Sequence, residues 1–173
     1  DITARHYQEN IMNKKMEQEA NKINNILSDY FEYVNDVNVI MGKQIAKNGA
    51  KNLNLILDIF RDNVQHYMIS NQNSIVNNKL FSWSTYDWVD DQNYQTVNAK
   101  IGIRTDNPSD MSARRYTLTA RVAPWTLQFD SPALGIPSNR WVIPVATGVA
   151  DKNNKYLGAI AVGINIGLLS NNL

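Results

Sequence analysis

The segments Trp141–Val149, reading Trp-Val-Ile-Pro-Val-Ala-Thr-Gly-Val, and Tyr156–Ile166, reading Tyr-Leu-Gly-Ala-Ile-Ala-Val-Gly-Ile-Asn-Ile, decide the fold class of this 173-residue chain. The stretch Asp-Lys-Asn-Asn-Lys at 151–155 between them is typical of a turn, so the two segments predict a β-hairpin. Side chains alternate along a strand, which puts large aliphatic residues on one face of this hairpin and small ones on the other. The aliphatic face predicts contact with a helix layer. The small-residue face predicts either a closely packed segment or the floor of a cavity.

A long helix is predicted for the first third of the chain. Apolar residues recur there at steps of three, four and seven between Ile11 and Met41, the spacing of one helix face. No proline precedes Pro108, and Asn48-Gly49 is a good helix end. A helix of about 40 residues would be about 60 Å long. Since that exceeds the width of a domain of this size, part of it must project or pair with another helix.

The middle of the chain predicts a second helix and then strands. The second helix is expected near Asn52 to Tyr67, and strands are expected at Leu80 to Trp88 and Thr96 to Ile103. The polar stretch 90–93 between the two strands predicts a turn. Residues 107–110 supply helix caps, and a short helix is expected from Ser112 to Arg121.

Composition narrows the function classes. Hydrophobic residues make up 43% of the chain, charged residues 19%, and the net charge is +1. These values are typical of a globular domain and argue against a dedicated nucleic-acid binder. The absence of cysteine excludes disulfides, a thiolate metal site and a cysteine nucleophile.

Catalytic and metal-binding patterns are also weak. His6 and His66 lie in helical segments without matching acidic or metal-ligand spacing, and both are predicted at the surface. Asp87, Asp90 and Asp91 lack EF-hand spacing, so a solvated turn is expected there. No phosphate-binding glycine loop or nucleophile elbow is present, and no cofactor, metal site or catalytic residue is predicted.

Three motifs carry a resemblance to a known family. Residues 110–116 read Asp-Met-Ser-Ala-Arg-Arg-Tyr, 143–151 read Ile-Pro-Val-Ala-Thr-Gly-Val-Ala-Asp, and 157–166 read Leu-Gly-Ala-Ile-Ala-Val-Gly-Ile-Asn-Ile. In this order the motifs resemble the extracytoplasmic PAS-like sensor domains of the Cache superfamily, which carry Asp-Leu-Ser-x-Arg-x-Tyr before a closing strand pair. The resemblance implies an α+β fold, a PAS-like antiparallel sheet with a long N-terminal helix packed on one face.

The same resemblance implies a single sensor domain over residues 1–173. Its expected parts are a long helix (1–50), a second helix and connection (51–78), the sheet and ligand pocket (79–166) and the start of an exit segment to the membrane (167–173). Such a domain lies on the periplasmic side of the bacterial inner membrane between flanking spans, and is not itself an enzyme. It would sense a small, carboxylate-bearing metabolite and signal by helix displacement to a histidine kinase, a chemotaxis transducer or a cyclic-dinucleotide enzyme. The alternative is a ligand-free dimerisation or interaction module of a membrane receptor.

The family's arginine and aromatic residue correspond to Arg114 and Tyr116. A guanidinium group binds a carboxylate through two parallel hydrogen bonds, and a phenol adds a directional donor. The alternative is a solvated arginine and a core tyrosine, and the adjacent Arg115 is expected at the surface. Asn165 stands where the family often has Asp, so a carboxylate or neutral ligand is favoured over one recognised by its ammonium group. The predicted ligand-binding residues are Arg114, Tyr116, Trp125, Trp83, Tyr86, Ala146, Gly163 and Asn165.

The apolar stripe of the long helix also predicts self-association. A stripe that outruns the sheet would face water unless a partner helix covered it. Asn21, Asn24 and Asn25 interrupt the stripe, so the expected partner is a second copy held in a weak homodimer.

Overall fold

The computed structural model describes residues 1–68, 74–76, 79–81, 83–134 and 141–165, with the backbone alone described between 65 and 84. The side chains of His66 and Trp83, the residue Ile166 and the predicted exit segment 167–173 therefore lie outside the described part. The elements are α1 (Ile2–Asn48), α2 (Leu53–Met68), β1 (Ser74–Val76), β2 (Lys79–Phe81), β3 (Trp83–Asp90), β4 (Tyr94–Asn98), β5 (Gly102–Ile103), β6 (Ser109–Asp110), α3 (Arg115–Val122), β7 (Leu127–Phe129), β8 (Ala133–Leu134), β9 (Trp141–Ala150) and β10 (Tyr156–Asn165).

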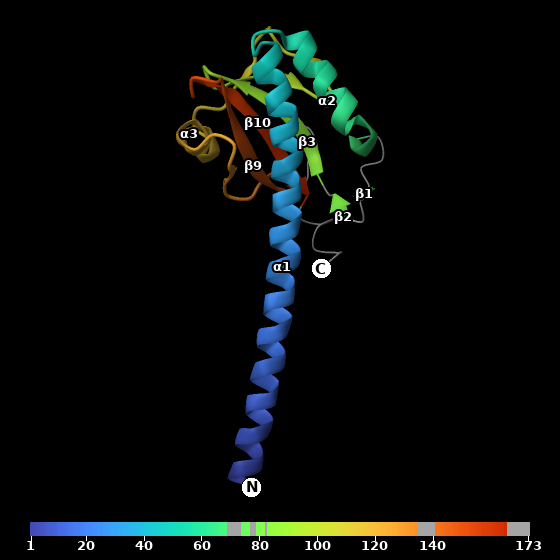
Figure 1. Cartoon of the computed structure of the whole chain (residues 1–173), viewed down its shortest axis with the longest axis vertical. Coiled ribbons are helices and arrows are strands. Elements are labelled where there is room, and N and C mark those ends of the chain that lie inside the picture. Colours follow the sequence, from blue (N-terminus) through green and yellow to red (C-terminus); the bar gives the residue numbers. More distant parts are fainter. Residues whose placement is uncertain (69–73, 77–78, 82, 135–140, 166–173) are drawn as a thin grey trace.

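An antiparallel sheet forms the centre of the domain (Figure 1). Its strands run in the order β5-β4-β3-β10-β9-β7, with β6 added beside β4 and β8 beside β9, while β1 and β2 form a separate pair. The hairpin predicted from 141–166 is confirmed, and β10 lies between β9 and β3. In this register Ala161 faces Ala146 on one side and Asp87 on the other. The PAS-like antiparallel sheet with a long N-terminal helix is thus confirmed.

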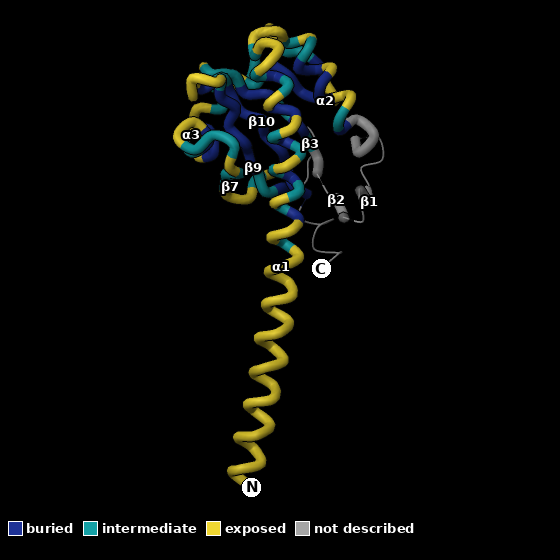
Figure 2. Tube along the Cα trace, viewed as in Figure 1, coloured by how far each residue is buried: buried dark blue, intermediate teal, exposed yellow. Residues whose placement is uncertain are grey.

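Helix α1 has 47 residues, which makes it about 70 Å long. Only its C-terminal part packs on the sheet, through buried residues from Tyr30 to Ile45. Residues 1–26 are exposed throughout and extend away from the sheet (Figure 2). The prediction that part of this helix projects is therefore confirmed.

Helices α1 and α2 cover the aliphatic face of the sheet. Ile160, Val162 and Ile164 of β10 join Val145 and Val149 of β9 in this core, as the alternation predicted. Each such side chain contributes about 1.5–3 kcal/mol when it is fully buried.

One polar link crosses this core. The Thr147 hydroxyl donates to Asn35 Oδ1 at 2.8 Å and accepts from Asn38 Nδ2 at 3.0 Å, so that β9 is hydrogen-bonded to α1.

The other face of the sheet carries the small residues and is covered only in part. Helix α3 packs closely on Ala146, Gly148 and Ala159. A Cβ atom added to Gly148 would lie 2.2 Å from the carbonyl oxygen of Ala120 in α3, so only glycine fits at this approach. One part of the small-residue face is therefore closely packed, and the part beyond α3 is left for a cavity.

Two sequence predictions for the middle of the chain need correction. The strand expected at 96–103 is divided into β4 and β5, because Asn98 Oδ1 accepts from the backbone nitrogens of Lys100 and Ile101 and turns the chain. The helix expected from Ser112 begins instead at Arg115. Pairing of β6 with β4, and a bond from Ser112 N to Asp110 Oδ1 at 2.9 Å, hold the preceding residues in an extended turn.

Among the described residues, no helix combines the length and apolarity that crossing a bilayer requires.

Candidate functional site

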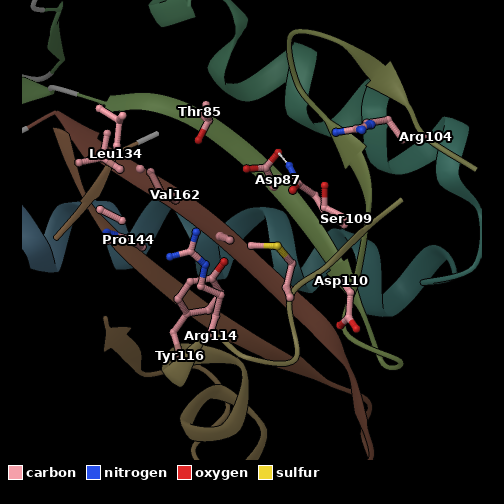
Figure 3. A pocket seen from close by; sticks show the side chains of 16 residues that line it. Thr85, Asp87, Arg104, Ser109, Asp110, Arg114, Tyr116, Leu134, Pro144 and Val162 are labelled. Atoms are coloured by element: carbon pink, nitrogen blue, oxygen red, sulfur yellow. Dashed lines mark hydrogen bonds between the residues drawn. The ribbon is translucent and has the colours of Figure 1, made fainter. Parts of the chain in front are cut away.

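A cavity of about 330 Å³ lies on the small-residue face of the sheet, beside α3 (Figure 3). This volume is at the lower end of the range for small-molecule sites. Its lining comes from β3, β4, the residue after β5, β6, the segment before α3 and the first turn of α3, β8 and the hairpin β9–β10. The lining residues are Thr85, Asp87, Gln95, Arg104, Ser109, Asp110, Met111, Arg114, Tyr116, Ala133, Leu134, Val142, Pro144, Ala161, Val162 and Gly163.

Arg114 enters this cavity from the residue that precedes α3. Its backbone is extended, with φ −78° and ψ 130°, and its carbonyl oxygen accepts from the Thr117 hydroxyl at 2.7 Å. The first turn of α3 therefore fixes the point from which the side chain leaves. Figure 3 shows the guanidinium group over the sheet near Tyr116 and Pro144. Arg115 is exposed, as predicted, and is not among the lining residues.

Tyr116 is a buried wall of the cavity. Its backbone nitrogen donates to Asp130 Oδ2 at 3.3 Å, and its side chain packs in the cluster that contains Ala146 and Ala161. Burial, and next the negative charge of Asp87, raise the pKa of the phenol well above its usual value. The hydroxyl therefore keeps its proton at neutral pH and is available as a hydrogen-bond donor.

The floor of the cavity lies close to the backbone of the sheet, because its residues have small or compact side chains. Gly163 of β10 lies opposite Pro144 of β9, and Ala161 lies one step along the same face. Together they leave room above the sheet at the point where α3 no longer covers it.

Asp87 of β3 lines the cavity, although its sequence pattern predicted no ligand-binding role. It lies in the strand expected at 80–88, and the solvated turn expected for Asp87 was wrong. Its Oδ1 accepts from Gln95 Nε2 and from Asn98 Nδ2. Burial raises the pKa of this carboxyl to about 6, although the hydrogen bonds act in the opposite direction. Strand alternation could have found it, because large aromatic residues at 86 and 88 predict that 85 and 87 share the small-residue face.

Two further charged groups lie at the edge of the cavity. Arg104 is anchored through its backbone nitrogen, which donates to Thr96 O at 2.7 Å. Asp110 is exposed, and the hydrogen bond from the Ser112 backbone lowers the pKa of its carboxyl. The cavity thus combines two guanidinium groups with two carboxyl groups over an uncharged floor.

Three of the predicted ligand-binding residues come together at this cavity: Arg114, Tyr116 and Gly163. Ala146 lies beneath α3, in contact with the same cluster as Tyr116 but outside the lining. Asn165 is buried opposite Val142, and it too lies outside the lining.

The predicted aromatic walls do not gather at the cavity. Tyr86 is fully buried on the opposite face of the sheet, in the core with Phe60 of α2, because strand alternation places it opposite to Asp87. The structure places Trp125 beside a separate hollow at the end of α1, where Lys43 Nζ lies 3.7 Å from the centre of its ring. The side chain of Trp83 is outside the described part of the chain.

Metal chemistry has no support in the described part of the chain, where no group of three or more His, Cys, Asp or Glu residues is arranged to hold an ion.

Comparison with solved structures finds the same fold in sensory domains of bacterial receptors. The ligand-binding domain of the Campylobacter jejuni chemoreceptor Tlp3 with isoleucine bound aligns with a TM-score of 0.62 at 14% identity, over 84% of this chain and 56% of that one. The ligand-binding domain of the Pseudomonas fluorescens chemoreceptor CtaA in complex with L-alanine aligns with a TM-score of 0.62 at 11% identity, over 86% and 57%. The extracellular domain of the putative histidine kinase rpHK1S-Z16 aligns with a TM-score of 0.62 at 16% identity, over 84% and 54%.

This similarity establishes the fold. The PAS-like sensor-domain architecture that the sequence motifs implied is confirmed at that level, and the chain spans a little over half the length of these domains. No protein-family model matches the chain, and no curated protein matches it in sequence.

Proposed function

We propose that this chain is the ligand-sensing domain of a bacterial membrane receptor and that it binds a small, carboxylate-bearing metabolite in the cavity beside α3. The observation that carries the proposal is the position of Arg114, a guanidinium group held over a floor of small residues next to a buried tyrosine. The aligned chemoreceptor domains have isoleucine and L-alanine bound, and both molecules carry a carboxylate. By the same analogy the domain would be periplasmic.

Recognition would begin with the carboxylate. The guanidinium fork of Arg114 offers two parallel N–H donors, and the phenol of Tyr116, which keeps its proton, offers an O–H donor. The low floor at Gly163 and Ala161 would receive the rest of the ligand. A cavity of about 330 Å³ suits a molecule of amino-acid size better than a large cofactor.

Signalling would use the two faces of the same strands. The cavity lies on one face of β9 and β10, while α1 packs on the other and is hydrogen-bonded to β9 through Thr147. A ligand that binds one arrangement of the sheet better than another shifts the population toward it. The position of α1 would shift with that population. Helix α1 would transmit this displacement to the output part of the receptor, which would be a histidine kinase, a chemotaxis transducer or a cyclic-dinucleotide enzyme.

The test compares Arg114→Ala with Arg115→Ala, because the two arginines are adjacent and only the first lines the cavity. A thermal-shift screen of L-amino acids and short carboxylates identifies a ligand, and calorimetry measures its affinity. We expect Arg114→Ala to lose about 1.5–3 kcal/mol of binding free energy, the range for a hydrogen bond to a charged group. Arg115→Ala should bind as the parent does. Equal affinities for all three proteins would contradict the proposal.

The second candidate function is a dimerisation or interaction module without a ligand. It is favoured by the exposed apolar side chains on the projecting part of α1, including Tyr7, Met12 and Met16, which are 67%, 62% and 64% exposed. In this case no small molecule would change the melting temperature, and sedimentation would show a dimer that depends on residues 1–26.

A further inference from the structure

The carboxyl group of Asp87 lies in an environment that disfavours its ionised form. It sits on the central strand β3, and it lines the cavity beside the uncharged floor of β10. Its hydrogen-bond donors include two neutral side-chain amides, those of Gln95 and Asn98. Within the described ranges, no lysine, arginine or histidine nitrogen forms an ion pair with it. A partly buried carboxylate without a direct ion-pair partner is unfavourable, because amide hydrogen bonds replace only part of its hydration. The positive charge of Arg104 favours the ionised form of Asp87, but it has the smallest effect among the groups that act on this carboxyl.

The hydrogen bonds fix where this carboxyl group points. Both amide donors reach the same oxygen, Oδ1, and both come from β4, the neighbouring strand. Such bonds hold the side chain in one orientation at the cavity. The Thr85 side chain also hydrogen-bonds to this carboxyl group, which lines the cavity.

The cavity therefore presents two opposite charges from different elements. Arg114 enters from the segment before α3, and Asp87 enters from β3, with the floor of β10 between them (Figure 3). Asn165, the position that suggested a ligand without a recognised ammonium group, lies outside the lining. The negative group that Asn165 cannot supply is present on another strand.

We propose that the ligand of this cavity carries a cationic nitrogen as well as a carboxylate, and that Asp87 is the residue that receives the cation. This inference rests on the proposed function, since it names the second charge of the same ligand. Binding would then give Asp87 a cation in direct contact, while Arg114 receives the carboxylate.

A purely structural role for Asp87, as a tie between β3 and β4, is the competing explanation. Asp87→Asn separates the two, because an asparagine keeps the Oδ1 acceptor for both amides and removes only the negative charge. Other charged or titratable groups also face Asp87 across the cavity, namely Arg104, Arg114, Tyr116 and Asp110. The pH dependence of ligand affinity in the parent protein must therefore be compared with that in the Asp87→Asn protein.

The experiment uses the full 173-residue chain and a panel of matched probes. L-Isoleucine carries both charges, 3-methylpentanoate lacks the ammonium group, and 2-methylbutylamine lacks the carboxylate. The other L-amino acids are screened with their own deamino and decarboxy analogues. We expect the two-charge member of a binding set to bind at least tenfold more tightly than its deamino analogue. In Asp87→Asn that advantage should disappear, while binding of the deamino analogue is unchanged or tighter. Affinity for the two-charge member should also fall below about pH 6, where Asp87 is protonated, in the parent protein but not in Asp87→Asn.

The outcomes separate this inference from the proposed function. If carboxylates bind in an Arg114-dependent way with no gain from an ammonium group, or if Asp87→Asn leaves the gain intact, the inference is wrong and the proposed function stands. If amines bind through Asp87 without any need for a carboxylate or Arg114, the cation site stands and the carboxylate proposal is wrong. If no member of the panel binds, both fall.

Discussion

Gly148→Ala probes the close contact on which the position of α3 depends. The added Cβ would lie 2.2 Å from Ala120 O, 3.0 Å from Ala120 C and 3.3 Å from the Cα of Pro124. All three atoms belong to the backbone, so no change of rotamer relieves the overlap. Helix α3 must instead move away from β9 by about 1 Å to restore ordinary contact, and overpacking of this kind costs about 1–3 kcal/mol. For a domain of this size the melting temperature should fall by about 2–12 °C.

The assay is a thermal melt followed by circular dichroism, together with ligand calorimetry. Gly42→Ala is the matched control, because its Cβ would meet side-chain atoms of Val149 and Trp125 at 2.9 and 3.0 Å, which can shift at lower cost. Gly148→Ala should destabilise more than Gly42→Ala, and it should also weaken ligand binding, because α3 carries Arg114 at its start. A melting temperature for Gly148→Ala equal to that of the parent would refute the close approach of α3 to the sheet.

Gly163→Leu should abolish ligand binding with secondary structure retained, because the leucine side chain would project from the cavity floor. Ala146→Leu should mainly lower the melting temperature, because it overpacks the contact beneath α3. Equal effects of the two variants on binding and on melting temperature would contradict this division. Without ligand, the free energy of unfolding of the parent should fall relative to that of Asp87→Asn by up to about 3 kcal/mol as pH rises from about 4 through 6. The reason is that folding raises the pKa of Asp87 to about 6, so the folded state favours the protonated carboxyl. Urea titrations at several pH values measure this, and a pH-independent difference would show that the pKa of Asp87 is not raised. Deleting residues 1–20 should abolish self-association in sedimentation and leave ligand affinity unchanged, and dimers that persist would place the interface on the sheet or α2.

The parts of the fold that could be predicted from sequence are those governed by local periodicity. The alternation along 141–149 and 156–166 predicted both the hairpin and which face meets the helices, since side-chain direction in a strand follows from backbone geometry. The spacing of apolar residues predicted α1, and its length alone required a projecting part.

The parts that could not be predicted depend on contacts between distant residues. Asn98 turns the chain by bonding two backbone nitrogens, which overrides the strand pattern of 96–103. Trp125 is near Arg114 in sequence, yet it packs against Gly42 of α1, and no local pattern indicates this. Asp87 lay inside the strand expected at 80–88, but its acidic neighbours at 90 and 91 favoured a solvated turn over a place at the cavity.

The projecting part of α1 would enlarge the helix displacement that the proposed function requires. Residues 1–26 extend about 39 Å beyond the part that packs on the sheet, as one continuous helix without proline. In the proposed signalling, the helix would act as a lever that pivots at its contact with β9 and β10. A tilt of about 3° at this contact, within what sub-ångström repacking of side chains can produce, moves the far tip sideways by about 2 Å. The displacement of the helix tip would then depend on the length of the projecting helix more than on the size of the change at the cavity.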